Sequence, residues 1–174
     1  MNQPVSIWKS SLTYGLYLGL ALVLVSAVFY VTGNTFAKSA SWVTYAVMTI
    51  GIALAQFNYR KLLGDEMNYG QAVGLGLLTM IFAAFITGFF TYLLYTVIDP
   101  SLQDQMRLFI EEQLVKQGNV PEGQIDMAIE MTARLQKPAI MFVLNIFNAA
   151  FVGLLISLIT AIFTKKKPAE DFSE

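Results

Sequence analysis

Residues 72–98 read AVGLGLLTMIFAAFITGFFTYLLYTVI, an apolar run that contains no Asp, Glu, Lys or Arg and stops at Asp99-Pro100. A helix needs roughly 20 mainly apolar residues to cross about 30 Å of hydrocarbon. The run is long enough for that crossing, and it carries no charge that lipid would penalise. It therefore predicts a membrane-spanning helix.

Three further stretches have the same character, at about residues 11–31, 40–57 and 138–163. The chain of 174 residues is 56% hydrophobic and 13% charged, whereas soluble domains carry about a quarter charged residues. A water-soluble protein of this size could not bury so much apolar surface. The sequence predicts an all-α integral membrane four-helix bundle, formed by a single membrane domain over residues 1–174 with a disordered tail at 164–174.

Basic residues flank the predicted spans unevenly. On one side they lie close to the spans, whereas on the other most are diluted in a long connection that also carries many acidic residues. Because cytoplasmic segments near spans carry the excess of Lys and Arg, we expect both termini in the cytoplasm. The first side carries Lys9, Arg60, Lys61, Lys165, Lys166 and Lys167, and the second carries Lys38, Arg107, Lys116, Arg134 and Lys137.

The connection 99–137 is the only sizeable polar segment, and it predicts an amphipathic helical hairpin outside the bilayer. Asp99 can cap a helix that has Pro100 at its first position, and Gly118 can end that helix. Asn119, Pro121 and Gly123 are typical of a turn. Two apolar faces then recur at helical spacing: Leu102, Met106, Phe109, Ile110 and Leu114, followed by Ile125, Ala128, Ile129, Thr132 and Leu135.

Cysteine and histidine are absent, which excludes disulfides, thiol chemistry, Cys/His zinc sites and imidazole acid–base catalysis. The net charge of −1 indicates no basic surface for nucleic acid. No arrangement of residues is typical of a catalytic site or a calcium loop. We therefore expect no enzymatic activity, no catalytic residue, no metal site, no cofactor and no nucleic-acid partner.

Three short motifs suggest a family. They are Asn58-Tyr59-Arg60-Lys61, Asn68-Tyr69-Gly70-Gln71-Ala72, and Ile98-Asp99-Pro100 at the end of a glycine-rich span. With four spans and a long helical insertion before the last one, the chain resembles the bacterial domain-of-unknown-function family forty-one-ninety-nine. The resemblance implies a multi-pass protein of the bacterial cytoplasmic (inner) membrane. The family brings no established activity, so the resemblance assigns no catalytic or binding residues.

Small residues recur four apart in every span, where they allow helix backbones to approach closely in lipid. One interpretation is packing within a single four-helix bundle, and the other is the seam of a homodimer. The candidates for helix packing are Gly15, Gly19, Gly51, Ala55, Gly70, Gly74, Ala84, Gly88, Ala149 and Gly153.

Two sets of polar residues are candidates for function. Asn145 and Asn148 lie three apart on the fourth span, where they predict either interhelical hydrogen bonds or the polar lining of a solute path. Glu122, Asp126 and Glu130 are spaced by four along the predicted hairpin. They predict either a docking face or a solvated helix face of little energetic value.

Two functional hypotheses follow. The first is a non-enzymatic membrane protein whose extracytoplasmic hairpin, within residues 99–137, contacts a protein partner. The alternative is a component of a small-solute or ion channel or transporter formed by self-association, as a homodimer for example. In both hypotheses the lipid bilayer is the solvent of the four spans.

Overall fold

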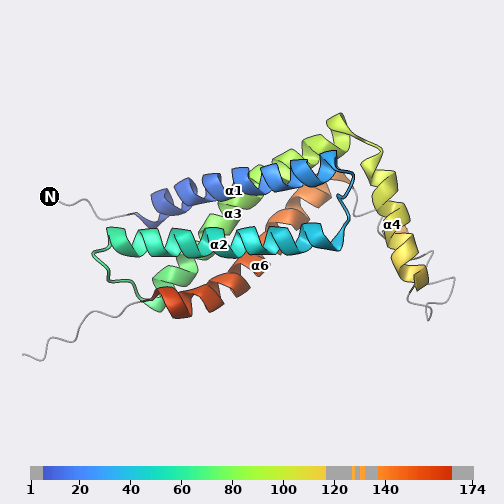
Figure 1. The fold of residues 1–174 in the computed structure, drawn as a ribbon. Helices are drawn as coiled ribbons and strands as arrows, with labels where there is room; N and C mark the ends of the chain where they lie inside the picture. Colours follow the sequence, from blue (N-terminus) through green and yellow to red (C-terminus); the bar gives the residue numbers. More distant parts are fainter. Residues whose placement is uncertain (1–5, 117–126, 128–129, 132–136, 166–174) are drawn as a thin grey trace, which may run out of the picture. The chain divides into compact units, whose positions relative to one another are not determined.

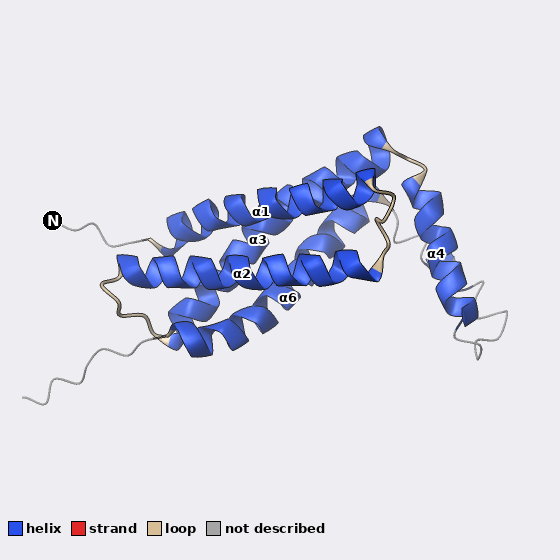
Figure 2. Ribbon diagram, in the orientation of Figure 1, coloured by secondary structure: helices blue, strands red, loops and turns tan. Residues whose placement is uncertain are grey.

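The computed structural model describes residues 6–116, 127, 130–131 and 137–165. The long helices are α1 (Ile7–Val31), α2 (Lys38–Leu62), α3 (Tyr69–Leu93), α4 (Leu102–Lys116) and α6 (Pro138–Thr164), and a π-helix, η1 (Leu94–Ile98), directly follows α3 (Figure 1). Helices joined by loops, without a strand, make up the described part of the chain (Figure 2). The predicted all-α class is confirmed.

Four helices are long and apolar enough to cross a membrane: Ile7–Val31, Lys38–Leu62, Tyr69–Ile98 and Ile140–Thr164. Their length and composition confirm the four predicted spans. The helices extend past the predicted apolar runs, most clearly in α2, which continues to Leu62. Arg60 and Lys61 lie in its last turn, where positive charge stabilises the negative end of the helix dipole.

The hairpin prediction is partly within the described residues. Its first helix, α4, begins at Leu102, two residues after the predicted start. Asp99 acts as a cap, because its Oδ1 accepts hydrogen bonds from the Ser101 amide at 3.1 Å and the Ser101 hydroxyl at 2.6 Å. Gly118 and the predicted turn lie outside the described residues, as do most of the second hairpin helix and residues 166–174. The predicted tail started too early, because Thr164 is the last residue of α6 and is buried.

The chain divides into two compact units, one formed by residues 1–87 and 146–174 and the other by residues 88–145. In the first unit, two groups of buried side chains join α1, α2, α3 and α6. One contains Leu18, Leu22, Ile52, Met80, Ala83, Ala84 and Ala149, and the other contains Ala55, Tyr59, Met67, Ala72, Leu75 and Ala161. Large apolar side chains cover the outside, including Leu24, Trp42 and Phe163, which are 67%, 75% and 74% exposed.

Glycines bring the helices of the first unit close together. A Cβ at Gly15 would lie 2.6 Å from Cβ of Phe82, and one at Gly19 would lie 2.8 Å from Cδ1 of Ile86. Gly15 and Gly19, which the sequence singled out, therefore pack on α3. Gly51 packs on Leu18, Gly153 packs on Met80, and Gly74 has Ile7 at ordinary contact distance.

The other small candidates occupy different surroundings. Ala55, Ala84 and Ala149 are buried in the core of the first unit. Gly70 is exposed, and a Cβ there would meet Oδ1 of Asn68 at 3.7 Å. In the second unit, a Cβ at Gly88 would lie 3.0 Å from the Phe142 ring.

The turn between α2 and α3 contains two consecutive residues in the left-handed region, Gly64 and Asp65, each with φ of 74°. Glycine adopts this conformation freely, whereas a residue with a side chain, such as Asp65, adopts it at a cost in free energy that other contacts must offset. Nε of Arg60 donates a hydrogen bond to Oδ1 of Asp65 at 3.0 Å. The Asn-Tyr-Arg-Lys motif thus contributes to the turn that starts α3.

The π-helix η1 is not expected from the sequence. Its backbone bonds reach one residue further than in an α-helix, as in the bond of 2.8 Å from the Asp99 amide to the Leu94 carbonyl oxygen. A π-helical turn holds one more residue than an α-helical turn but has the same apolar composition, so the hydropathy of the sequence does not reveal it. π-Helical turns are rare, and they occur frequently at functional sites.

Candidate functional site

Helix α4 is the longest described part of the predicted docking segment, and its two sides differ in burial. Leu102 is buried, and Met106, Phe109 and Ile110 are half-buried, which agrees with the predicted apolar face. Nε2 of Gln103 also donates a hydrogen bond to the Tyr95 carbonyl oxygen at 2.9 Å. The hydrogen bond attaches the first turn of α4 to η1 within the second unit.

The opposite side of α4 carries Asp104, Leu108, Glu111 and Val115, which we call the α4 outer face. Leu108 is 64% exposed and Val115 is 60% exposed. Because seven residues make nearly two helical turns, the two apolar side chains lie on one line, with Asp104 and Glu111 beside them. Leu108 and Val115 were not among the residues expected from the sequence, although their spacing of seven is visible there.

Glu130 is the described member of the predicted acidic face, where it is helical and exposed. Its two companions, Glu122 and Asp126, lie outside the described residues. Met127 and Met131, which flank Glu130, are 70% and 64% exposed. Among the described residues, no group of three or more Asp or Glu side chains is placed to hold a metal ion.

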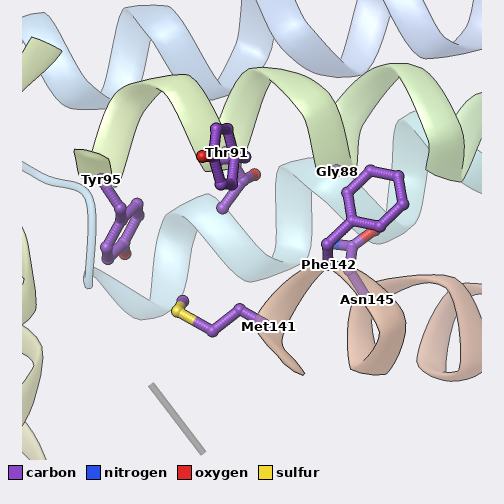
Figure 3. A pocket seen from close by; sticks show the side chains of 7 residues that line it. Gly88, Thr91, Tyr95, Met141, Phe142 and Asn145 are labelled. Atoms are coloured by element: carbon purple, nitrogen blue, oxygen red, sulfur yellow. The ribbon is translucent and has the colours of Figure 1, made fainter. Parts of the chain in front are cut away.

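A small pocket lies between the end of α3 and the start of α6, within the second unit (Figure 3). Its volume is about 10 Å³, which is room for about one water molecule. Glycine at position 88 leaves space for the Phe142 ring, and the adjoining η1 begins at Leu94. The pocket is lined by Gly88, Thr91, Tyr92, Tyr95, Met141, Phe142 and Asn145.

Asn145 supplies a buried acceptor at this pocket. Its Oδ1 is buried and accepts no hydrogen bond from the residues that the structure describes. An unsatisfied buried polar atom costs about 1–3 kcal/mol, and a water or another small donor in the pocket would offset that cost. The chemistry available here is the binding of one donor group.

Asn148 is placed differently from Asn145. It is exposed and does not line the pocket. Exposed apolar rings precede and follow it on α6, since Phe147 is 71% exposed and Phe151 is 63% exposed. An amide thus lies on an apolar, lipid-exposed surface of a spanning helix.

A buried polar group in the first unit joins three helices at the end of α2. Nε2 of Gln56 donates to the Ala72 carbonyl oxygen at 3.1 Å, and Oγ1 of Thr164 donates to Oε1 of Gln56 at 3.0 Å. Arg60, one turn after Gln56, donates to the Thr164 carbonyl oxygen at 3.1 Å. Gln56 is fully buried and Thr164 is 1% exposed, so these bonds connect α2, α3 and α6 away from lipid.

The sequence contains a periodic signal for this group that was not among the expected site residues. Ser157, Thr160 and Thr164 recur at spacings of three and four along α6, which places their hydroxyls on one side of that helix. All three are buried. Gln56 could not be paired with Thr164 from the sequence, because 108 residues separate them.

One family model matches most of the chain. It is described as "Protein of unknown function (DUF4199)", and it matches residues 13–166. Neither the comparison with curated proteins nor the comparison with solved structures found a match. The resemblance inferred from the Asn-Tyr-Arg-Lys, Asn-Tyr-Gly-Gln-Ala and Ile-Asp-Pro motifs is thereby confirmed. The chain belongs to the DUF4199 family, and within that family it is a multi-pass membrane protein with four spanning helices.

Proposed function

We propose that this membrane protein is not an enzyme and that it contacts a protein partner through the segment 99–137. The observation that carries the proposal is the α4 outer face, where Leu108 and Val115 are 64% and 60% exposed on a helix of 15 residues. A helix of that length is too short to cross a membrane. Burying a Val or Leu side chain contributes about 1.5–3 kcal/mol. Covering both side chains would therefore favour association by several kcal/mol.

The charges beside these side chains favour a protein over the membrane surface. Asp104 and Glu111 flank Leu108 and Val115 on the α4 outer face, whereas helices that lie on membranes are rich in Lys and Arg on their polar side. Helix α4 as a whole carries Asp104, Glu111 and Glu112 against Arg107 and Lys116, so it lacks the excess of basic side chains that binds anionic lipid. The partner surface that fits is apolar and bordered by Lys or Arg.

Site-specific photo-cross-linking in native membranes tests this proposal. A photoreactive residue at Leu108 and, separately, at Val115 is expected to give one common protein adduct. The matched control is Gln113, which is also exposed but lies about 140° away from Leu108 around the helix. The substitution Leu108→Asp is expected to abolish the adduct formed from Val115. Adducts with lipid alone, or equal adducts from all three positions, would refute the proposal.

The proposal includes the location and orientation of the chain. We propose the bacterial inner membrane with both termini in the cytoplasm, on the basis of Lys9, Arg60, Lys61 and Lys165 beside the spans. Three spans precede α4, so this orientation puts α4 outside the cytoplasm. A reporter fused after residue 116 is expected to lie outside the cytoplasm, and a reporter fused at the C-terminus is expected to lie inside it. The orientation would be overturned if both reporters lay on the same side of the membrane.

The alternative is a self-associating component of a solute or ion pathway. It is favoured by Asn148, an exposed amide between Phe147 and Phe151 on a spanning helix, because an amide in lipid gains a hydrogen bond when a second helix supplies a partner. Asn148→Leu is then expected to reduce the dimer fraction in detergent and any flux through reconstituted vesicles. A monomeric wild-type protein without flux would exclude this alternative.

A further inference from the structure

Two open hollows follow each other between α1 and α2 on the outside of the first unit, and we call them together the groove. The larger part has a volume of about 390 Å³, and the second hollow, further along the same two helices, has a volume of about 230 Å³. Exposed side chains form the walls of the larger part, including Tyr17, Ile50 and Leu54, which are 63%, 59% and 55% exposed. Ala21 and Gly51 are half-buried and line the groove between those walls.

The polarity of this groove changes along its length. The larger part is lined at one end by Tyr14, Tyr17 and Asn58. Further along α1, the second hollow has an entirely apolar lining that includes Val28 and Phe29. From Tyr14 to Phe29 the groove follows α1 for about 22 Å, which exceeds the roughly 15 Å of hydrocarbon that one leaflet contributes. The groove is therefore long enough for an acyl chain, and its polar residues lie at one end, as in the binding site of an amphiphile.

A positive charge lies in line with the polar end. Lys61 is exposed and follows Leu54 by seven residues on α2, so it lies nearly on the same side of the helix as the groove wall. It belongs to the last turn of α2, together with Arg60. Arg60 is already engaged with Asp65 and the Thr164 carbonyl oxygen. Lys61 is therefore the cation that a bound headgroup would meet.

We propose that this groove binds one anionic glycerophospholipid. Its acyl chain lies between α1 and α2, its ester region lies at Tyr14, Tyr17 and Asn58, and Lys61 binds the phosphate. The surface involved is separate from the α4 outer face, so this inference does not depend on the proposed partner. A second copy of the chain fits less well, because a two-fold axis along the membrane normal at this groove would bring two Lys61 side chains together.

The test uses a phospholipid with a photoreactive diazirine in its acyl chain. The full chain is reconstituted in phosphatidylcholine vesicles that contain a small fraction of labelled phosphatidylglycerol or, in a parallel sample, labelled phosphatidylcholine. The labelled peptides are then mapped. Phosphatidylglycerol is expected to label the groove around Leu18, Ala21 and Leu54 in preference to the lipid-exposed side of α6 around Phe151 and Ile159, which are 63% and 61% exposed. Phosphatidylcholine is expected to show no such preference.

Two substitutions and one control sharpen the result. Lys61→Gln is expected to reduce groove labelling by phosphatidylglycerol about fivefold, the factor expected for one basic side chain at an anionic lipid. The control is Lys9→Gln, which removes the same charge from a residue in line with Leu16 rather than with the groove, and it is expected to leave the labelling unchanged. Ala21→Phe is expected to fill the groove and abolish labelling there.

The outcomes separate the proposed occupant from the others. Equal labelling by the two lipids, or equal labelling of the groove and of α6, would overturn the proposal, because ordinary surrounding lipid would explain it. Cross-links between two chains at Ala21 or Ile50 would overturn it in favour of a second copy. The mapping of the wild-type protein distinguishes these outcomes even where Ala21→Phe lowers the yield of folded protein.

Discussion

Gln56 makes two buried hydrogen bonds to other spans of the first unit. Its amide nitrogen donates to the Ala72 carbonyl oxygen at 3.1 Å, and its amide oxygen accepts from Thr164 at 3.0 Å. Hydrogen bonds between membrane helices average about 0.6 kcal/mol, with a maximum near 1.7. We therefore expect Gln56→Met to lower the free energy of unfolding by about 1.2 kcal/mol, for two average bonds.

A double-mutant cycle isolates one of these bonds. Thr164→Val is nearly isosteric and removes the donor to Gln56, so its cost is expected to be about 0.6 kcal/mol. The double variant Gln56→Met with Thr164→Val is expected to be less destabilised than the sum of the single changes by about the same amount. The Thr164 hydroxyl also lies 3.1 Å from the Thr160 carbonyl oxygen of its own helix, so the coupling energy, rather than the cost of Thr164→Val, measures the bond to Gln56. The matched control is Thr160→Val, because the Thr160 hydroxyl donates to the Ile156 and Ser157 carbonyl oxygens within α6.

The assay is reversible unfolding in mixed micelles, in which sodium dodecyl sulfate is titrated and the loss of helical circular dichroism is followed. The expected order of stability is wild type, then Thr160→Val, then Thr164→Val, then Gln56→Met. Equal losses for Thr160→Val and Thr164→Val, together with a zero coupling energy, would refute the reasoning. That result would mean that the contact between α2 and α6 contributes nothing beyond packing.

Three further predictions use the same unfolding measurement. Gly153→Ala is expected to destabilise the protein by about 1–3 kcal/mol through overpacking, because the added Cβ would lie 2.5 Å from Met80. Gly74→Ala is expected to be neutral or stabilising, because the nearest atom to its added Cβ lies at 3.7 Å. Equal effects of the two changes would contradict the close packing of Gly153 on Met80. Asn145→Leu is expected to stabilise by about 1 kcal/mol, because it removes a buried oxygen without a partner among the described residues, and a loss of stability would instead indicate a bound donor. Arg60→Gln is expected to cost about 1 kcal/mol, because Arg60 bonds both Asp65 and the Thr164 carbonyl oxygen of another span. Asp65→Asn is expected to cost less, because Asp65 is 48% exposed and exposed ion pairs contribute little; the reverse order would contradict this.

The site residues illustrate where sequence reasoning stops. Spacing placed Asn145 and Asn148 near each other on α6, but only the fold distinguishes the oxygen at a pocket from the exposed amide. Similarly, the apolar spacing on α4 predicted which side packs, whereas Leu108 and Val115 could be recognised as uncovered only once the neighbours of α4 were known. Whether a side chain is exposed depends on which other helices pack against it, and the sequence around the residue does not reveal those helices.

The four spans follow from the sequence alone, because membrane insertion depends on the summed hydrophobicity of about 20 consecutive residues. The start of α4 near Asp99-Pro100 is similarly local, since capping involves neighbouring residues. The tertiary structure alone decides that Gly15 and Gly19 pack on α3 and that Gln56 meets Thr164. The physical reason is that the large side chains of a spanning helix are apolar all around, so their periodicity does not distinguish protein from lipid. Small and hydroxyl side chains can mark a packing side, but they do not say which helix packs there.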